Sequence, residues 1–147
     1  MADSPLKKIL EPESVAFLGA SNNINTMGTF QLFNVLEDGF DGRVYPVHPK
    51  EKRILGRDVY PSIADLPEAV DVAVMVLPTR LVPQILEECG EKGIRHATIV
   101  SGGFEEAGED GAQLQRRIVE IAEKYGIRFT GPNCIGVCNP VNGYNNT

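Results

Sequence analysis

Tryptophan is absent from the 147-residue chain, and histidine and cysteine are scarce, with two and three residues respectively. The cysteines, Cys89, Cys134 and Cys138, are odd in number and match no disulfide framework. Cys134 and Cys138 also have no second pair that would complete a zinc site. We therefore expect reduced thiols and no metal in this domain.

Long hydrophobic runs are also missing. The longest, Val72–Leu77, is far too short to span a bilayer, and the segment Met1–Leu10 has no apolar core of signal-peptide length. The formal net charge of −6 argues against a general nucleic-acid binder. The sequence therefore predicts a soluble, cytoplasmic protein with no membrane partner and no nucleic-acid partner.

The composition of the whole chain, 42% hydrophobic and 23% charged, is typical of one globular domain. Short apolar runs alternate with segments of helical periodicity, the pattern of a parallel sheet with right-handed crossovers. We therefore expect an α/β, Rossmann-like doubly wound sheet of five parallel strands in the order 3-2-1-4-5, with helices on both faces. The strands are expected at 15–18, 43–47, 71–78, 97–100 and 127–130, and the helices at about 6–10, at 26–38, at 79–92 and in a last segment that ends at Gly126.

The helix expected at 26–38 has a regular apolar pattern. Met27, Phe30, Phe33 and Leu36 recur every three residues, which places them on one side of the helix. The segment that follows the second strand, 51–67, has no clear periodicity and is expected to be a connector.

The stretch from Val15 to Leu36 reads as strand, loop and helix. Its loop opens with Gly19, which lets the chain turn off the strand, and closes with Gly28, expected to let the backbone approach a ligand closely. The first N–H groups of a helix lack intrahelical partners and attract anions, so the loop is a candidate phosphate site. Its short polar side chains are Ser21, Asn22, Asn23 and Asn25. The alternative is an ordinary strand-to-helix turn.

Ligands of open parallel sheets bind at the carboxyl ends of the strands. At the end of the second strand an NAD site needs an acidic residue, but Val47-His48-Pro49 is followed by Lys50, which suits a phosphorylated ribose. The glycine loop also lacks the Gly-x-Gly-x-x-Gly spacing of dinucleotide sites. His48 and His96 are expected to be structural, and no residue is predicted to be catalytic.

In these motifs the chain resembles the CoA-binding domain of the NDP-forming acyl-CoA synthetases, the superfamily of ADP-forming acetate–CoA ligases and the succinyl-CoA synthetase α subunit. The resemblance covers nearly the whole chain. It rests on Ser14-Val-Ala-Phe-Leu-Gly-Ala-Ser21, Gly39-Phe-Asp-Gly-Arg-Val-Tyr-Pro-Val-His-Pro-Lys50, Tyr60-Pro-Ser-Ile-Ala-Asp-Leu-Pro67, Glu87-Glu-Cys-Gly-Glu-Lys-Gly93, Ser101-Gly-Gly-Phe-Glu-Glu106 and Gly131-Pro-Asn-Cys-Ile-Gly-Val137.

The resemblance implies a path for coenzyme A along the strand ends. The loop from Gly19 to Gly28 would hold its phosphates, and Lys50 would lie near the 3′-phosphate. Residues 76–79 would wall the adenosine and pantetheine, and residues 101–103 and 132–134 would lie toward the thiol. The implied binding residues are Gly19, Ala20, Ser21, Asn22, Asn23, Thr26, Met27, Gly28, Val47, His48, Pro49, Lys50, Val76, Leu77, Pro78, Ser101, Gly102, Gly103, Pro132, Asn133 and Cys134.

Two departures from the family pattern bear on this path. Asn25-Thr26-Met27 replaces the Pro and Lys that the family commonly has before Gly28, and His48 replaces the Asn of its Asn-Pro-Lys. A phosphate contact of the family is therefore missing or replaced.

The resemblance further implies a module of a larger ligase that converts acid, CoA and NTP to acyl-CoA, NDP and phosphate. In the family the phosphohistidine and the ATP-grasp fold belong to other domains, so this chain alone is expected to be inactive. We expect a lead-in at 1–13, the CoA-binding domain at 14–138 and a tail at 139–147 that leads toward a following domain. The alternatives are a stand-alone CoA-binding regulatory or carrier protein and, less favoured, an NAD(P)-binding redox-sensor module.

Overall fold

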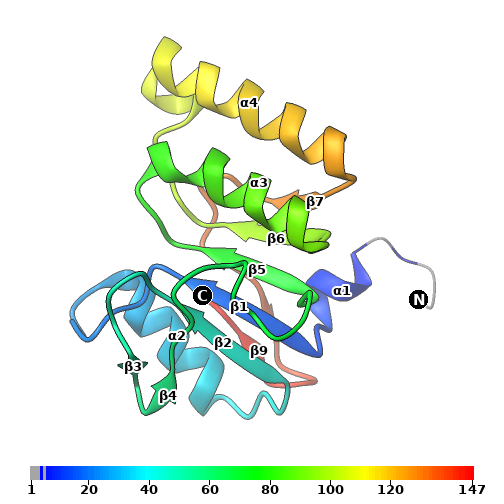
Figure 1. Cartoon of the computed structure of the whole chain (residues 1–147). Coiled ribbons are helices and arrows are strands. Elements are labelled where there is room, and N and C mark those ends of the chain that lie inside the picture. Colours follow the sequence, from blue (N-terminus) through cyan, green and yellow to red (C-terminus); the bar gives the residue numbers. More distant parts are fainter. Residues whose placement is uncertain (1–3, 5) are drawn as a thin grey trace.

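The computed structural model describes Ser4 and residues 6–147 (Figure 1). Among these residues, five parallel strands form one sheet, and two short antiparallel pairs lie outside it. The helical elements are α1 (Lys7–Leu10), α2 (Met27–Glu37), η1 (Thr79–Leu81), α3 (Val82–Lys92), η2 (Glu105–Ala107) and α4 (Glu109–Tyr125). The strands are β1 (Ser14–Leu18), β2 (Arg43–Val47), β3 (Arg53–Ile54), β4 (Arg57–Asp58), β5 (Val72–Met75), β6 (His96–Ile99), β7 (Arg128–Thr130), β8 (Cys138–Asn139) and β9 (Tyr144–Asn145).

Local sequence signals set the helix boundaries. Thr26 caps α2, because its side chain accepts the N–H of Thr29. The helices α3 and α4 end at Gly93 and Gly126, whose φ angles of 96° and 66° are left-handed and cost glycine little. The elements of the predicted α/β fold are therefore confirmed.

The predicted strand order is wrong in one place. The third long strand, β5, lies between β1 and β6, so the sheet runs β2-β1-β5-β6-β7, or 2-1-3-4-5. All four residues of β5 are buried. A strand that is apolar on both faces buries the most apolar surface when it lies in the interior of a sheet. β2 is an edge strand instead, with an exposed Arg43 and with Pro46, which has no N–H to donate.

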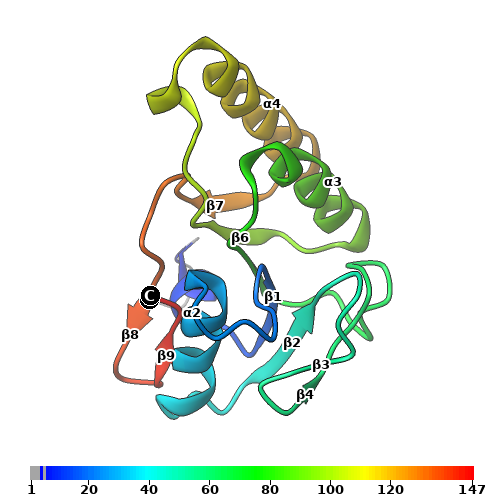
Figure 2. The same ribbon diagram turned by 90° about the vertical axis from the view of Figure 1, so that its left-hand side faces the viewer.

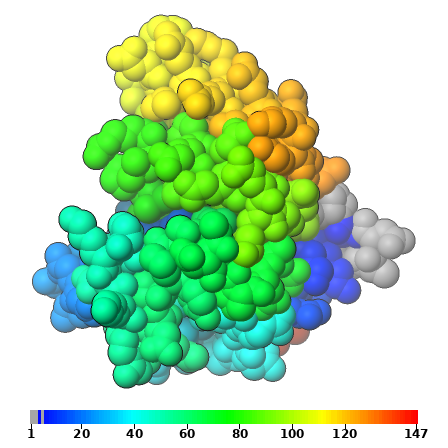
Figure 3. Space-filling model, viewed as in Figure 1, coloured from blue at the N-terminus to red at the C-terminus, as the bar shows by residue number. Residues whose placement is uncertain are grey.

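Helices cover both faces of the sheet (Figure 2), and the side chains of the central strands alternate between two apolar layers. One set, which includes Leu18 and Met75, packs under α3 and α4. The connector between β2 and β5 completes this layer with its buried Ile63 and lies directly below α3 (Figure 3). The opposite set, which includes Phe17 and Val74, packs against α1, α2 and the last residues of the chain.

The segment expected to be a tail folds onto the domain. β8 and β9 form a hairpin, and Tyr144 is fully buried with its ring 5.1 Å from that of Phe40, centroid to centroid. Asn146 is also buried, and its side-chain oxygen accepts the N–H of Val137. The last residues are thus part of the layer that covers the α2 side of the sheet.

Candidate ligand-binding groove

The strand order reverses between β1 and β5, and their carboxyl ends touch. The N–H of Val76 donates to the carbonyl of Leu18 at 2.9 Å. A Cβ at Gly19 would lie 1.9 Å from the carbonyl oxygen of Val76, and Gly19 has a φ of 107°, so only glycine fits there. In doubly wound sheets this reversal is the place where a crevice forms and ligands bind.

The glycine loop is held mainly by one buried threonine. Thr29 Oγ1 accepts the N–H of Ser21 and donates to the carbonyl of Ser21, each at 3.0 Å. Beside it, the first-turn N–H groups of Met27 and Gly28 have no intrahelical acceptor and carry the positive end of the helix dipole. The start of α2 therefore has backbone donors without an intrahelical acceptor, and Thr29, which sequence analysis did not single out, holds the loop at Ser21.

Gly28 makes room for the backbone of the glycine loop. A Cβ there would lie 2.2 Å from the carbonyl oxygen of Gly19, so the missing side chain makes room for the loop backbone. Gly28 is buried. Its small size lets α2 pack against the loop, and this close contact is with the protein's own backbone.

The end of β2 is tied to the same loop. The side-chain amide of Asn22 donates to Glu51 Oε2 at 2.6 Å and to the carbonyl of Arg53 at 3.0 Å. His48 Nδ1 accepts the N–H groups of Lys50 and Glu51, at 3.1 and 3.0 Å. This acceptor role agrees with the structural function expected for His48, and it fixes the turn that carries Lys50.

Two cavities lie along the strand ends and share Val76 and Leu77. We call them the β2-side cavity, of about 540 Å³, and the β7-side cavity, of about 570 Å³, and together the strand-end groove. The β2-side cavity is lined by Leu18, Gly19, Ala20, Ser21, Val47, His48, Pro49, Pro61, Ser62, Ile63, Val76, Leu77, Pro78, Leu81, Gln84, Ile85 and Glu88. The β7-side cavity is lined by Met27, Val76, Leu77, Val100, Ser101, Gly102, Asn133, Cys134 and Ile135.

Most residues expected to contact the ligand line this groove. Those that do not are Asn22, Asn23, Thr26, Gly28, Lys50, Gly103 and Pro132. Sequence analysis missed Leu81 of η1, the α3 residues Gln84, Ile85 and Glu88, and the connector residues Pro61, Ser62 and Ile63. The helical periodicity of α3 shows its buried face, but only the strand order reveals that its first two turns border the crevice.

The β7-side cavity has ordered polar walls. Ser101 Oγ accepts the N–H of Leu77 at 3.0 Å and donates to the carbonyl of Leu77 at 2.7 Å, which joins the ends of β5 and β6. The N–H of Gly103 donates to Glu106 at 2.6 Å and holds the pKa of that carboxyl below its usual range. Cys134 Sγ lies 3.4 Å from the carbonyl oxygen of Ile99.

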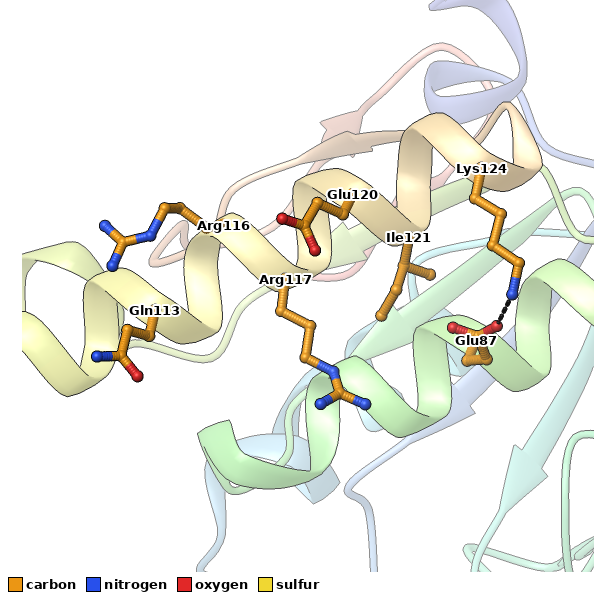
Figure 4. Close-up of a pocket in the computed structure, with 7 residues that line it drawn as sticks. All are labelled: Glu87, Gln113, Arg116, Arg117, Glu120, Ile121 and Lys124. Carbon is orange, nitrogen blue, oxygen red and sulfur yellow. Dashed lines mark hydrogen bonds and ion pairs between the residues drawn. The ribbon is translucent and has the colours of Figure 1, made fainter.

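A separate hollow of about 450 Å³ lies between α3 and α4, and charged side chains line it (Figure 4). Lys124 pairs with Glu87, which also accepts the hydroxyl of Tyr125 at 2.7 Å, and these contacts lower the pKa of Glu87. The hollow is formed by helix side chains, whereas the strand-end groove has the backbone donors of a loop and a helix start. We therefore take the groove as the candidate site.

The described residues lack two other features, a membrane-spanning helix and a cluster of metal ligands. None of their helices is both long enough and apolar enough to cross a bilayer. They also contain no group of three or more His, Cys, Asp or Glu residues placed to hold a metal ion.

The fold and the groove together define a class: an α/β domain with a groove at the switch point of a parallel sheet, where such folds typically bind ligands. Residues 13–140 match the family described as CoA binding domain, and the chain belongs to this family. The resemblance stated from the sequence is thereby confirmed.

Similar proteins are CoA ligases of greater length. The Archaeoglobus fulgidus protein named acetate–CoA ligase (ADP-forming) II is 46% identical over 139 residues, which are 95% of this chain and 21% of that protein. The α subunit of acetate–CoA ligase (ADP-forming) I of Pyrococcus furiosus is 45% identical over 136 residues, 90% of this chain and 29% of the subunit. The apo structure described as the dinucleotide-forming acetyl-coenzyme A synthetase 1 of Candidatus Korarchaeum cryptofilum superposes with a TM-score of 0.92 at 34% identity, over 97% of this chain and 31% of that one. The chain thus spans less than a third of each of these proteins.

Proposed function

We propose that the strand-end groove binds coenzyme A along its whole length. The observation that carries this proposal is that the two cavities meet at Val76 and Leu77, beside the glycine loop and the start of α2. The chemical groups of CoA follow one another in the same order as these features: a base and ribose, a pyrophosphate, and a long arm that ends in a thiol. A long ligand of this kind needs a groove with donors for phosphate near its middle.

Each part of CoA has a place in this arrangement. The adenosine occupies the β2-side cavity, where Ile63 and Ile85 offer apolar walls to the base. The pyrophosphate lies against the N–H groups at the start of α2. The pantetheine passes Val76 and Leu77, and the thiol reaches the β7-side cavity near Ser101 and Cys134.

Lys50 is proposed to recognise the 3′-phosphate of the ribose. Its side chain is exposed on the turn that His48 orders, and it forms no ion pair with the residues that the structure describes. A free ammonium at this position attracts a phosphate and disfavours NAD, whose 2′-hydroxyl is bound by an acidic residue in typical dinucleotide sites.

We further propose that the chain serves an ADP-forming acyl-CoA ligase as its CoA-binding part. The thiol sulfur would attack the carbonyl carbon of an acyl phosphate made elsewhere in the enzyme; the C–S bond forms and the C–O bond to phosphate breaks. The contribution of this domain is to hold the sulfur in position, which lowers the entropic cost of the encounter. The names of the relatives support this role.

Calorimetry on the 147-residue chain tests the ligand. We expect CoA to bind more tightly than dephospho-CoA or NAD, and added salt to weaken binding because the main attractions join opposite charges. Lys50→Ala should weaken CoA binding about tenfold, or about 1.4 kcal/mol, and leave dephospho-CoA binding unchanged. Lys7→Ala, at an exposed lysine of α1, is the matched control and should change neither.

Two results would contradict the proposal at different levels. Equal affinity of the unmodified chain for CoA and dephospho-CoA would remove Lys50 from the site. The absence of any CoA binding would refute the assignment of the groove itself.

A further inference from the structure

The apolar side of α2 faces away from the sheet. Met27, Phe30 and Phe33, which the sequence places on one side of the helix, are 62%, 60% and 47% exposed. The side that packs on the sheet is formed by other residues, including the fully buried Leu32 and Val35. We call Met27, Phe30 and Phe33 the α2 stripe.

The rest of the α2 surface is as poor in charge as the stripe. From Met27 to Leu36 the helix has no charged residue, whereas a solvent-facing helix normally has a charged outer side. The longest helix, α4, provides the comparison within the same chain. Its exposed charged residues are Glu109, Asp110, Arg116, Arg117, Glu120, Glu123 and Lys124. The sequence of α2 is therefore that of a helix covered on both sides.

Two further large apolar side chains are exposed in the sequence segments around the groove. Ile24, in the glycine loop, is 72% exposed, and Ile135 is 75% exposed. Ile135 lies beside α2, because the buried side chain of Gln31 donates to its carbonyl at 2.9 Å. An apolar area of this extent, spread over two segments far apart in sequence, is characteristic of a protein contact surface.

The end of the chain lies on the same helix. The side-chain amide of Asn34 donates to the carbonyl of Thr147 at 2.8 Å, and β9 packs against α2 (Figure 2). The relatives are more than three times as long as the segment that they share with this chain. In a protein of that length, the polypeptide that follows the shared segment starts within reach of the stripe.

The same surface borders the groove. Met27 and Ile135 line the β7-side cavity and are also largely exposed. A protein body that covers the stripe therefore also covers the end of the groove where the proposed function puts the thiol. That is where an acyl phosphate, made outside this domain, has to arrive.

We propose that the α2 stripe, with Ile24 and Ile135, is the docking surface for the part of an acyl-CoA ligase that follows the CoA binding domain, and that docking closes the β7-side cavity. The inference rests on the proposed function and adds to it the face through which the two parts meet. It assigns Phe30 and Phe33, which do not line the groove, to docking alone.

The test joins this chain, at Thr147, to the remainder of the Archaeoglobus fulgidus ligase in place of the segment that matches. Hydrogen–deuterium exchange should be slower in α2 of the fused protein than in α2 of the 147-residue chain. The double variant Phe30→Ser/Phe33→Ser should remove this protection and lower acyl-CoA formation about tenfold or more, because large aromatic side chains dominate contact energies. Val119→Ser, at a 41% exposed position of α4, is the matched control and should change neither quantity.

Calorimetry on the 147-residue chain separates docking from ligand binding. The double variant should bind CoA as tightly as the unmodified chain, since neither phenylalanine lines the groove. If the unmodified chain binds no CoA, the proposed function fails. If it binds CoA but α2 exchanges equally fast in both proteins, or the double variant retains full activity, the docking proposal alone fails.

Two more outcomes are informative. A dimer of the 147-residue chain in sedimentation, dissociated by the double variant, would assign the stripe to a second copy and overturn the proposal. If the fused protein does not unfold cooperatively, the exchange comparison is made on the chain mixed with the separately produced remainder, with the same expected and contrary results.

Discussion

The three thiols lie in three different environments. Cys89 is 1% exposed on α3, and burial raises its pKa to about 12, which keeps it protonated and inert at neutral pH. Cys138 is exposed on β8. Cys134 is half-buried in the wall of the β7-side cavity. The rates at which the three thiols are alkylated can therefore report whether a ligand occupies that cavity.

We expect acetyl-CoA to protect Cys134, and only Cys134, from alkylation by iodoacetamide. With ligand at about ten times its Kd, modification of Cys134 should slow about tenfold, since only the unoccupied fraction reacts. Cys138 is the internal control and should react at an unchanged rate, while Cys89 should stay unmodified in the folded protein. Peptide mass spectrometry measures all three. Unchanged modification of Cys134 at saturating acetyl-CoA would place the thiol end of the ligand elsewhere.

Single residues were predictable where their chemistry is local. Gly19 was assigned correctly to the turn off β1, and Lys50 was noted from its place after a strand. Thr29 and Glu51 were not, because their importance comes from hydrogen bonds to Ser21 and Asn22, which depend on how the loop folds. Gly28 was recognised as a position of close approach, but the sequence does not show which atoms approach it.

At the scale of elements, the sequence predicts the type and bounds of each element better than it predicts which elements pack side by side. The apolar run at β5 was correctly predicted to be a strand, yet its central place in the sheet was missed. The stripe of α2 shows the same limit for a helix. Its period of three predicts which side chains share a side, but the side that meets the sheet is chosen by the buried Leu32 and Val35.

The contact between α2 and the glycine loop makes Gly28 a stability determinant. Gly28→Ala should cost about 3 kcal/mol in the free energy of unfolding, because its Cβ would overlap backbone that cannot move freely. Gly39→Ala is the control: Gly39 has a φ of 89° with no atom near the new Cβ, and only about 1 kcal/mol of backbone strain is expected. Urea unfolding measures both. If both substitutions lower the free energy of unfolding equally little, the loop adapts easily to a Cβ, and the contact with the loop does not explain Gly28.

At the scale of the whole molecule, the net charge of the chain opposes the binding of the proposed ligand. The chain has a net charge of −6, while the proposed ligand is a polyanion. Binding must therefore rely on local donors, which are the N–H groups at the start of α2 and the ammonium of Lys50. The composition argues against nucleic acid as a general partner, but it could not reveal a groove whose two cavities come from strand ends far apart in sequence.

For the whole chain, we expect no labelling when it is incubated with radiolabelled ATP and magnesium, because phosphoryl transfer needs a site for the metal-bound nucleotide and a phosphate acceptor. The sequence has no Gly-x-x-x-x-Gly-Lys-[Ser/Thr] loop. His48 Nδ1 is occupied by two backbone N–H groups, and His96 lies at the amino end of β6, with Nδ1 3.2 Å from the carbonyl oxygen of Asp71, at the edge of the sheet opposite the groove. Neither histidine is among the residues that line the β7-side cavity. The fused ligase, assayed in parallel, should carry acid-labile label outside this domain. Label on His48 or His96 of the 147-residue chain would make the domain itself a phosphoryl acceptor and contradict its assignment to CoA binding and positioning alone.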